Sequence, residues 1–330
     1  MASSGDIEIW DVIIIGGGVA AYTAGIYTSR AKLTTLVLEG ENWGGQLMTT
    51  DIVENFPAFP EGISGFDLVN KMRDQSLKYG AIHVESNVND VQHVGEIFVV
   101  AINDKKYTTR SIIVATGAIA KVIEYPSYIY NDDEQAISAP LEGDPFWNHG
   151  ISACAVCDGA LPIFRRKPIY VVGGGDSACE MALYLTKYAS EVHILVRSSK
   201  MRASAILQDR VQSHPKITLE YNTNVESLYG EVSETRTRLS HIRVRIHSET
   251  RVVPCSGLFF AIGHQPNTTF LNGLVKLDDH GFIVTQNTVT NVKGVFACGD
   301  VQDPVFKQAI TACGTGCQAA LACETYVSSL

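Results

Sequence analysis

The sequence has no long apolar run. Its 330 residues are 45% hydrophobic and 18% charged, yet no stretch reaches the roughly 20 consecutive apolar residues that a membrane-spanning helix needs. Residues 1–10 also lack the basic and apolar regions of a secretory signal peptide. We therefore expect a globular, cytoplasmic protein with no membrane partner. The length exceeds the usual ceiling for a single core, so we also expect two domains.

Basic residues and cysteines are also few. The 26 Lys and Arg residues, against 35 Asp and Glu, give a net charge of -9, whereas a nucleic-acid-binding surface concentrates positive charge, so we expect no nucleic-acid partner. Eight cysteines are too few and too scattered for the disulfide framework of a small secreted protein. Cys313 and Cys317 share a helix face, but a metal ion would need two further ligands, and none lies nearby in the sequence.

The first strong pattern is a strand, a glycine-rich turn and a helix near the start of the chain. Residues 11–15, Asp-Val-Ile-Ile-Ile, form an apolar run typical of a buried strand, and a helix is expected to about Ala31. Gly16 would permit the tight turn and Gly18 would let the backbone approach a pyrophosphate. Ala21 would allow the helix to pack closely on the strand.

A second expected strand, residues 35–38, ends in Glu39, which lies 21 residues after Gly18. A carboxylate at this position accepts hydrogen bonds from a ribose diol and repels a 2′-phosphate. The pattern therefore predicts a dinucleotide site, for which FAD is suitable. The alternative is an ordinary glycine-rich turn.

The same design recurs later in the chain, which indicates an internal duplication. Residues 169–172 form the expected strand, and Gly173, Gly175 and Ala178 occupy the three small positions. A helix is expected over residues 177–188.

The strand that follows this helix, expected at residues 191–196, ends differently from its counterpart. Where the first unit has Glu39, this one has Arg197, with Lys200 and Arg202 just beyond. Guanidinium groups suit a 2′-phosphate by charge and by bidentate geometry, so this site is expected to prefer NADPH. The alternative is a basic surface loop. An FAD site and an NADPH site together imply hydride transfer from nicotinamide to flavin.

Between the two units lies the sequence Cys154-Ala-Val-Cys157, followed by Asp158 and Gly159. In a Cys-x-x-Cys pair one thiolate is stabilised and reactive, and the disulfide can be reduced by two electrons. A zinc site would need a second such pair, and the sequence has none. The pair therefore predicts redox chemistry.

Specific motifs are spread over nearly the whole chain. They are Trp43-Gly-Gly-Gln46-Leu, Val53-Glu-Asn55-Phe-Pro, Ala115-Thr-Gly117-Ala, Cys154-Ala-Val-Cys157-Asp-Gly, Gly173-Gly-Gly-Asp-Ser177-Ala and Gly299-Asp300-Val-Gln-Asp, followed by Gln308-Ala309-Ile. Together they closely resemble the low-molecular-weight thioredoxin reductases. This resemblance implies an α/β fold of two Rossmann-like, three-layer ββα nucleotide-binding domains, with the NADPH domain inserted into the FAD domain.

The resemblance also implies a role for each site residue. Cys157 would face the flavin and take its electrons, Cys154 would attack the disulfide of thioredoxin, and Asp158 would be the general acid. The residues implied to bind FAD are Gly16, Gly18, Ala21, Glu39, Gln46, Asn55, Ala115, Thr116, Gly117, Asp300, Gln308 and Ala309. Those implied to bind NADPH are Gly173, Gly175, Asp176, Ser177, Arg197 and Arg202.

The domain organisation follows from the same resemblance. The FAD domain would comprise residues 1–121 and 250–330, and the NADPH domain residues 122–249, with a return linker at residues 252–256. The resemblance further implies a homodimer, and a rotation that brings the nicotinamide and the disulfide to the flavin in turn. Residues 122–140 look longer than the usual connection, and their Tyr, Pro and acidic content predicts a surface loop.

The predicted function is a thioredoxin-disulfide reductase that passes electrons from NADPH through FAD and the Cys154–Cys157 disulfide to thioredoxin. A flavin-dependent dithiol oxidase would share the fold and the dithiol but would need no NADPH site, and Arg197 and Arg202 count against it. A flavin-loaded redox sensor or interaction protein would be expected to lose one cysteine or Asp158, and all three are present.

Overall fold

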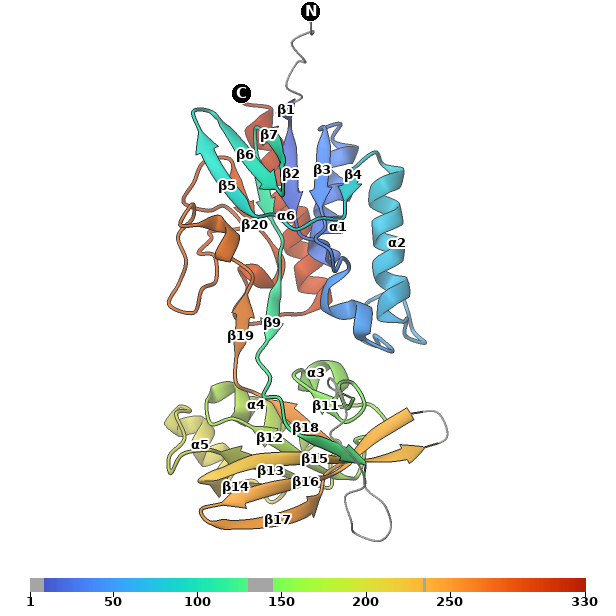
Figure 1. The fold of residues 1–330 in the computed structure, drawn as a ribbon, viewed down its shortest axis with the longest axis vertical. Helices are drawn as coiled ribbons and strands as arrows, with labels where there is room; N and C mark the ends of the chain where they lie inside the picture. Colours follow the sequence, from blue (N-terminus) through green and yellow to red (C-terminus); the bar gives the residue numbers. More distant parts are fainter. Residues whose placement is uncertain (1–8, 130–144, 234–235) are drawn as a thin grey trace, which may run out of the picture. The chain divides into compact units, whose positions relative to one another are not determined.

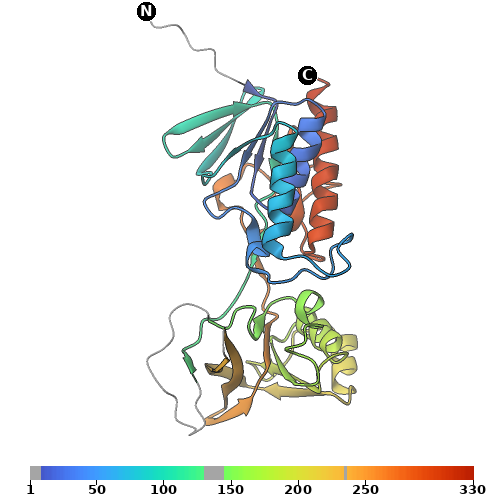
Figure 2. The ribbon, with the colours of Figure 1, turned by 90° about the vertical axis from the view of Figure 1, so that its right-hand side faces the viewer.

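The computed structural model describes residues 9–129, 145–233 and 236–330. It divides into two compact units: unit 1 is Met1–Ile119 with Gln265–Leu330, and unit 2 is Ala120–His264. Along the chain, unit 2 is thus inserted into unit 1. In each unit a parallel sheet carries helices on one face and a second, mostly antiparallel sheet on the other (Figure 1, Figure 2). This three-layer α/β architecture confirms the expected fold class.

Unit 1 is built on a parallel sheet with the strand order β20-β8-β2-β3-β4. Its strands are β2 (Val12–Ile15), β3 (Thr35–Leu38), β4 (Ile82–Val84), β8 (Ile112–Val114) and β20 (Val295–Ala297), and its helices are α1 (Val19–Arg30), α2 (Gly65–Lys78) and α6 (Ala309–Val327). The second sheet has the order β1-β7-β6-β5, from β1 (Ile9–Trp10), β5 (Asp90–Val94), β6 (Ile97–Ile102) and β7 (Lys105–Thr109). Short 3-10 turns lie at Gly45–Thr49, Thr269–Leu271 and Gly299–Val301.

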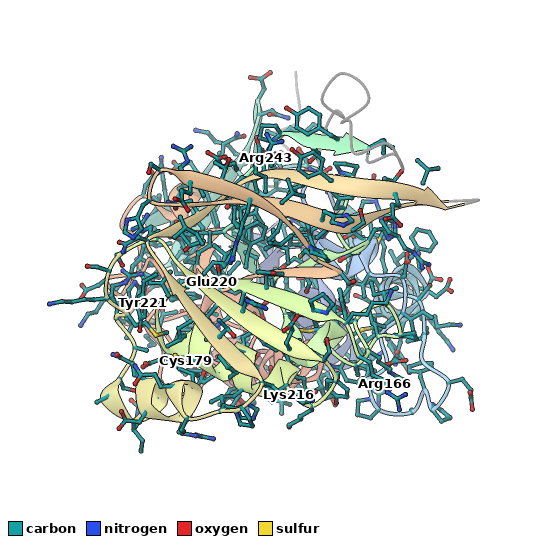
Figure 3. All side chains as sticks on the ribbon, turned by 90° about the horizontal axis from the view of Figure 1, so that it is seen from below. Arg166, Cys179, Lys216, Glu220, Tyr221 and Arg243 are labelled. Atoms are coloured by element: carbon teal, nitrogen blue, oxygen red, sulfur yellow. A yellow bond between two sulfur atoms is a disulfide. The ribbon has the colours of Figure 1, made fainter. Side chains whose placement is uncertain are left out.

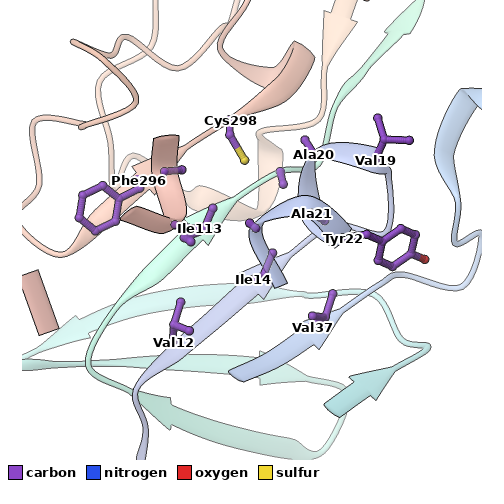
Figure 4. Packing of buried hydrophobic residues seen from close by; sticks show 14 of the residues in the cluster. Val12, Ile14, Val19, Ala20, Ala21, Tyr22, Val37, Ile113, Phe296 and Cys298 are labelled. Atoms are coloured by element: carbon purple, nitrogen blue, oxygen red, sulfur yellow. The ribbon is translucent and has the colours of Figure 1, made fainter. Parts of the chain in front are cut away.

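Strand β2 shows why two cores form in unit 1. Val12 and Ile14 pack with Ala21 and the other helix residues, as Figure 4 shows. Ile13 and Ile15 point the other way, into the core shared with the second sheet. Alternate residues of a strand face opposite sides, so a strand buried on both faces is an unbroken apolar run.

Unit 2 repeats this plan with the parallel strand order β11-β18-β12-β13-β14. The strands are β11 (Ile151–Ser152), β12 (Pro168–Val172), β13 (Glu191–Val196), β14 (Ile217–Tyr221) and β18 (Gly257–Phe260), and the helices are α3 (Ala155–Asp158), α4 (Asp176–Leu185) and α5 (Ala205–Gln212). The second sheet consists of β10 (Ser127–Ile129), β15 (Thr223–Ser233), β16 (Arg236–Ile246) and β17 (Glu249–Pro254). Figure 3 shows unit 2 from below, with Glu220 and Tyr221 on β14 and Arg243 on β16. Strands β9 (Ala118–Ala120) and β19 (His264–Pro266) pair with each other.

The chain returns from unit 2 to unit 1 later in the sequence than expected. Residues 252–256, expected as a return linker, lie inside unit 2, which extends to His264. The reason is the apolar run of β18, whose four residues are buried and which pairs in parallel with both β11 and β12. The chain must therefore add this central strand to the sheet of unit 2 before it returns to unit 1.

Residues 122–140 also differ from the expected surface loop where they are described. Ser127–Ile129 form β10, which pairs in parallel with β15. Tyr125 stacks on Phe260 at 6.3 Å between ring centroids, and Tyr128 on Tyr229 at 5.6 Å. The aromatic side chains that suggested a loop are thus used to attach an edge strand; the segment beyond Ile129 lies outside the described residues.

Within the described ranges, no helix is both long and apolar enough to cross a membrane.

Candidate functional site

In unit 1 the residues expected to bind a dinucleotide follow strands of one parallel sheet. Gly16 follows β2, Glu39 follows β3, Ala115 follows β8 and Asp300 comes shortly after β20. These four strands are neighbours in the sheet and run in the same direction. The carboxyl ends of such strands are where open α/β sheets bind ligands. The sheet therefore brings residues from four distant parts of the sequence to one edge.

The glycine turn after β2 has the shape of a phosphate-binding loop. Gly16 has φ +132°, and a Cβ there would lie 2.2 Å from the Ala115 carbonyl oxygen, so only glycine fits. Gly18 is the N-cap of α1, and a Cβ there would meet nothing within 4 Å. Open space above free N–H groups at the start of a 12-residue helix suits a pyrophosphate. Ala21 is fully buried in the core under this helix.

Asp300 is a partly buried carboxyl at the same edge. Burial and, to a smaller extent, nearby Asp303 raise the pKa of Asp300 to about 6, although Lys307 partly opposes the rise. No hydrogen bond joins its side chain to another residue in the described part of the chain. A carboxyl that is desolvated without a partner carries a cost, which a ligand hydroxyl at this position would relieve.

Glu39 is at its expected position, but the protein already binds its carboxylate. The side chain is 0% exposed, and it accepts hydrogen bonds from Tyr22 Oη at 2.9 Å and from Arg73 Nε and Nη2, both at 2.8 Å. The Nδ1 atom of His83 is 2.8 Å from Oε1. Burial raises the pKa of Glu39, but these hydrogen bonds outweigh it and hold the pKa at about 2.

To accept hydrogen bonds from a ribose as expected, the Glu39 carboxylate would have to share oxygens that Tyr22, Arg73 and His83 already contact. Arg73 also binds Glu85 and stacks on Trp43, with the guanidinium carbon 4.5 Å from the ring centroid. Sequence analysis missed Arg73 and His83 entirely. Neither lies in a recognisable motif, and their distance from Glu39 in the sequence, 34 and 44 residues, carries no pattern that could reveal them.

The remaining residues expected near a flavin also lie in unit 1. Asn55 Nδ2 donates to Gln308 Oε1 at 3.3 Å, which joins positions 253 residues apart. Gln308 is the N-cap of α6, and Ala309 is the first residue of that helix. Gln46 Nε2 donates to the Ala118 carbonyl at 2.5 Å. The segment after β8 contains Thr116 and Gly117. Thr116 Oγ1 donates to the Asn267 carbonyl, and Gly117 has φ +70°.

The phosphate-type loop of unit 2 repeats the geometry of the first. Gly173 has φ +153°, and a Cβ there would lie 2.5 Å from the Ala261 carbonyl oxygen. Gly175 is the N-cap of α4, and a Cβ there would meet nothing within 4 Å. Asp176 and Ser177 form the first turn of α4 and are exposed. Asp176 Oδ1 accepts the Ser204 N–H at 2.6 Å, which fixes the start of α5 against the loop.

Two arginines lie beyond the neighbouring strand. Arg197 follows β13 and Arg202 is five residues further on; both are exposed. The backbone N–H of Arg202 donates to the Gly174 carbonyl at 2.6 Å, so this residue is anchored to the glycine loop. Neither guanidinium forms an ion pair within the described residues, which leaves both available to an anionic ligand.

The dithiol lies at the same edge of the unit 2 sheet. Cys154 comes two residues after β11, and β11, β18 and β12 are neighbouring parallel strands. Cys154 and Cys157 form a disulfide with a Cα–Cα distance of 5.3 Å. Cys154 is the N-cap of α3, and its Sγ accepts the N–H of Cys157 at 3.2 Å. Val156, between the two cysteines, is 51% exposed, so the turn is accessible from outside unit 2.

Asp158 is the last residue of α3, and its surroundings favour the protonated carboxyl. Burial raises the pKa of Asp158, and a hydrogen bond from Ser152 partly opposes the rise. Ser152 Oγ donates to Asp158 Oδ2 at 2.5 Å and accepts the N–H of Cys154 at 3.0 Å. Sequence analysis missed Ser152, although its position two residues before Cys154 could have drawn attention to it.

The six other cysteines are free. They are Cys179, Cys255, Cys298, Cys313, Cys317 and Cys323. Burial is the main cause that raises the pKa of the thiols of Cys255, Cys298 and Cys323, which keeps them protonated and unreactive. Among the described residues, no group of three or more His, Cys, Asp or Glu side chains is placed to hold a metal ion.

Comparison with known proteins is consistent with this arrangement. Residues 10–316 match the family model described as pyridine nucleotide-disulphide oxidoreductase. The chain is 47% identical to thioredoxin reductase of Dictyostelium discoideum, with 98% of this chain and 99% of the relative covered. It is 43% identical to thioredoxin reductase of Chlamydia pneumoniae, with 96% and 98% covered.

Solved structures give the same result. Thioredoxin reductase from Streptococcus pyogenes superposes with a TM-score of 0.86 at 31% identity, covering 98% of this chain and all of that one. The enzyme from Giardia duodenalis gives 0.84 at 33% identity, with 97% and 99% covered. The chain therefore belongs to the pyridine nucleotide-disulphide oxidoreductases and, within them, to the thioredoxin reductases.

Proposed function

We propose that the protein is an NADPH-dependent thioredoxin-disulfide reductase that transfers electrons from NADPH, through FAD and the Cys154–Cys157 disulfide, to oxidised thioredoxin. The observation that carries the proposal is the Cys154–Cys157 disulfide at the same sheet edge as the loop of Gly173 and Gly175. An accessible disulfide next to a nucleotide-type loop is the arrangement that a dithiol relay needs.

The residues of unit 1 fit FAD. Gly18 leaves open space at the N-terminus of α1 for the pyrophosphate, and Asp300 offers a polyol hydroxyl a carboxyl that has no hydrogen bond to any described side chain. Asn55 and Gln308, joined to each other, supply amide groups for a flavin ring. When bound, FAD would accept a hydride from nicotinamide and return two electrons to a disulfide.

The residues of unit 2 fit NADPH. Gly175 leaves the start of α4 open to a pyrophosphate, and the exposed Arg197 and Arg202 can pair with a 2′-phosphate. This set of groups also argues against a flavin-dependent dithiol oxidase, which would have no use for a phosphate loop followed by two exposed arginines.

We assign the outward nucleophile to Cys154. Once the disulfide is reduced, the Cys157 N–H that points at Cys154 Sγ at 3.2 Å favours the thiolate on Cys154, because a hydrogen bond to the charged form lowers a thiol pKa. The Cys154 thiolate would attack one sulfur of thioredoxin to form a mixed disulfide, and the other thioredoxin sulfur would leave as a thiolate. Cys157 would then lose its proton and attack Cys154 Sγ, which breaks the mixed disulfide and restores the internal disulfide. The second thioredoxin sulfur leaves as a thiolate and takes up the proton that Cys157 has lost.

The first thioredoxin thiolate must take up a proton as it leaves, and Asp158 is the group proposed to supply it. Asp158 directly follows Cys157 in the sequence. Burial raises the pKa of its carboxyl, so the carboxyl stays protonated at a higher pH than that of an exposed Asp.

We further propose that the enzyme acts in the cytoplasm as a homodimer. Six free cysteines suit a reducing compartment. Size-exclusion chromatography with light scattering tests the dimer, which would be excluded by a mass of about one chain of 35.9 kDa.

The central experiment follows flavin colour and thioredoxin reduction in the intact protein and in Cys157→Ser. NADPH should bleach the flavin anaerobically in both proteins, whereas oxidised thioredoxin should restore the colour quickly only in the parent. Cys179→Ser, a change at a buried free cysteine of the same unit, is the matched control and should behave as the parent. Full thioredoxin reduction by Cys157→Ser would remove the disulfide relay from the mechanism.

A further inference from the structure

Ser152 links the two groups on which the dithiol chemistry depends. It is the last residue of β11 and is 2% exposed. Its single hydroxyl donates to Asp158 Oδ2 at 2.5 Å and accepts the N–H of Cys154 at 3.0 Å. The carboxyl of the proposed acid is therefore tied, through one side chain, to the backbone of the proposed nucleophile.

The direction of the first hydrogen bond shows which form of Asp158 it favours. A hydroxyl that donates to Oδ2 stabilises the carboxylate, which is the form left after Asp158 has given its proton to a leaving thiolate. Burial favours the protonated form, so Ser152 opposes burial at this site. Both forms must be accessible for a group that gives and regains a proton in every cycle.

Among the described residues, Ser152 is the one side chain that forms a hydrogen bond with the Asp158 carboxyl. Helix α4, which packs against α3, carries the titratable residues Asp176, Cys179, Glu180 and Tyr184. None of them contributes to the pKa shift of Asp158, whose causes are burial and the Ser152 hydroxyl.

We infer that Ser152 is a positioning residue of the reductase, whose hydroxyl fixes the Asp158 carboxyl beside Cys154 and sets how readily that carboxyl releases its proton. The inference rests on the proposed function, in which Asp158 is the acid. The chemical balance of the exchange is unchanged: one proton leaves Asp158 for the departing thioredoxin thiolate, solvent later returns it, and Ser152 keeps its own proton throughout.

The test compares Ser152→Ala with Ser152→Thr, which retains a hydroxyl, and with Ser227→Ala. Ser227 is a matched control because it is also buried in unit 2 and donates to a side chain, Tyr229 Oη at 3.1 Å. The measurement is the pH profile of flavin reoxidation by thioredoxin in the NADPH-reduced holoenzyme. Anaerobic bleaching by NADPH is recorded in parallel.

Loss of the Ser152 hydroxyl should move the apparent pKa assigned to Asp158 upward by about one pH unit, the size expected for one hydrogen bond to a partly buried carboxylate. Ser152→Thr should restore the parent profile, Ser227→Ala should not change it, and bleaching should be equal in all four proteins. A parent profile for Ser152→Ala would overturn the inference. If Ser152→Ala does not fold, Ser152→Gly lacks the same hydroxyl and gives the same two outcomes.

Asp158→Asn separates this inference from the proposed function. If Asp158→Asn keeps the parent profile, Asp158 is not the acid and the assignment under the proposed function fails, and the inference fails with it. If Asp158→Asn loses thioredoxin reduction while Ser152→Ala keeps the parent profile, only the role of Ser152 is refuted.

Discussion

The buried Glu39 network supports a quantitative prediction for the substitution Glu39→Gln. The amide has the size of the carboxyl but carries no charge, so it resembles the protonated side chain. The network holds the pKa of Glu39 at about 2, against an ordinary value of 4.5. At about 1.4 kcal/mol for each pKa unit, the ionised form gains about 3 kcal/mol over the neutral form. The Glu39 side chain is 0% exposed, so solvent screening does not reduce this figure much.

The sign of the pH dependence follows from the lowered pKa. Because the folded-state pKa lies below the unfolded one, ionised Glu39 stabilises the fold fully above pH 4.5 and loses this contribution as the pH falls toward 2. Glu39→Gln should therefore lower the free energy of unfolding by about 3 kcal/mol near pH 7. The gap between parent and variant should begin to close below pH 4.5.

Guanidinium unfolding followed by tryptophan fluorescence measures the effect. A Trp147→Phe background leaves Trp10 and Trp43, both in unit 1, as the reporters. Glu85→Gln is the matched control, because this second partner of Arg73 is 53% exposed and should cost less than about 1 kcal/mol. A loss under about 1 kcal/mol for Glu39→Gln near neutral pH, or a gap that stays constant as the solution is acidified, would refute the reasoning.

Three further changes test the nucleotide sites. Arg197→Ala and Arg202→Ala should each raise the KM for NADPH by about 10- to 100-fold, because each removes about one charge-assisted hydrogen bond. The KM for NADH should not change. An equal increase in KM for both coenzymes would contradict the 2′-phosphate assignment. Gly16→Ala should cost at least about 2 kcal/mol of stability and release flavin, because the added Cβ meets the Ala115 carbonyl at 2.2 Å and φ is +132°. Gly314→Ala in α6, where a Cβ meets nothing within 4 Å, is its control in thermal unfolding and flavin-release assays, and similar behaviour of the two variants would count against the close contact.

Local patterns identified much of the fold. The expected strands at residues 35–38 and 191–196 are β3 and β13 with the same bounds, because each is an apolar run between a helix and a polar segment. The start of each nucleotide-type helix could be placed for a similar reason, since its glycine turn leaves few backbone conformations.

Long-range pairing could not be found in this way. Strand β18 is a short apolar run that could equally have been a core strand of either unit, and only its pairing with β11 and β12 assigns it to unit 2. Strand β10 contains one aromatic residue, Tyr128, and directly follows Tyr125 and Pro126. This composition indicates a turn, yet Tyr128 stacks on Tyr229 of the neighbouring strand β15. Tertiary contacts overrode local preference in both cases.

In the candidate site, too, residues in short sequence motifs could be predicted, and residues that act through long-range contacts could not. Gly16, Gly173 and the Cys154–Cys157 pair could be predicted because their chemistry depends on short spacings along the chain. Arg73 could not, because its partner Glu39 lies 34 residues away and only the folded structure brings the two into contact. Ser152 lies close to Cys154 in the sequence, but its hydrogen bond to Asp158 is visible only in the structure. Glu39 illustrates both situations: its place after β3 was predictable, whereas the three side chains that bind its carboxylate were not.

Strand β20 and helix α6 place a condition on how the chain is synthesised. β20 is the outer neighbour of β8, and α6 packs so tightly on α1 that a Cβ at Gly316 would lie 2.4 Å from the Ala20 carbonyl oxygen. A ribosome must therefore translate all of unit 2 before unit 1 can bury β8 and α1. Unit 2 is continuous in sequence and can fold first. In the interval one edge of β8 has no partner strand and one face of α1 is uncovered, and both features favour aggregation of a nascent chain.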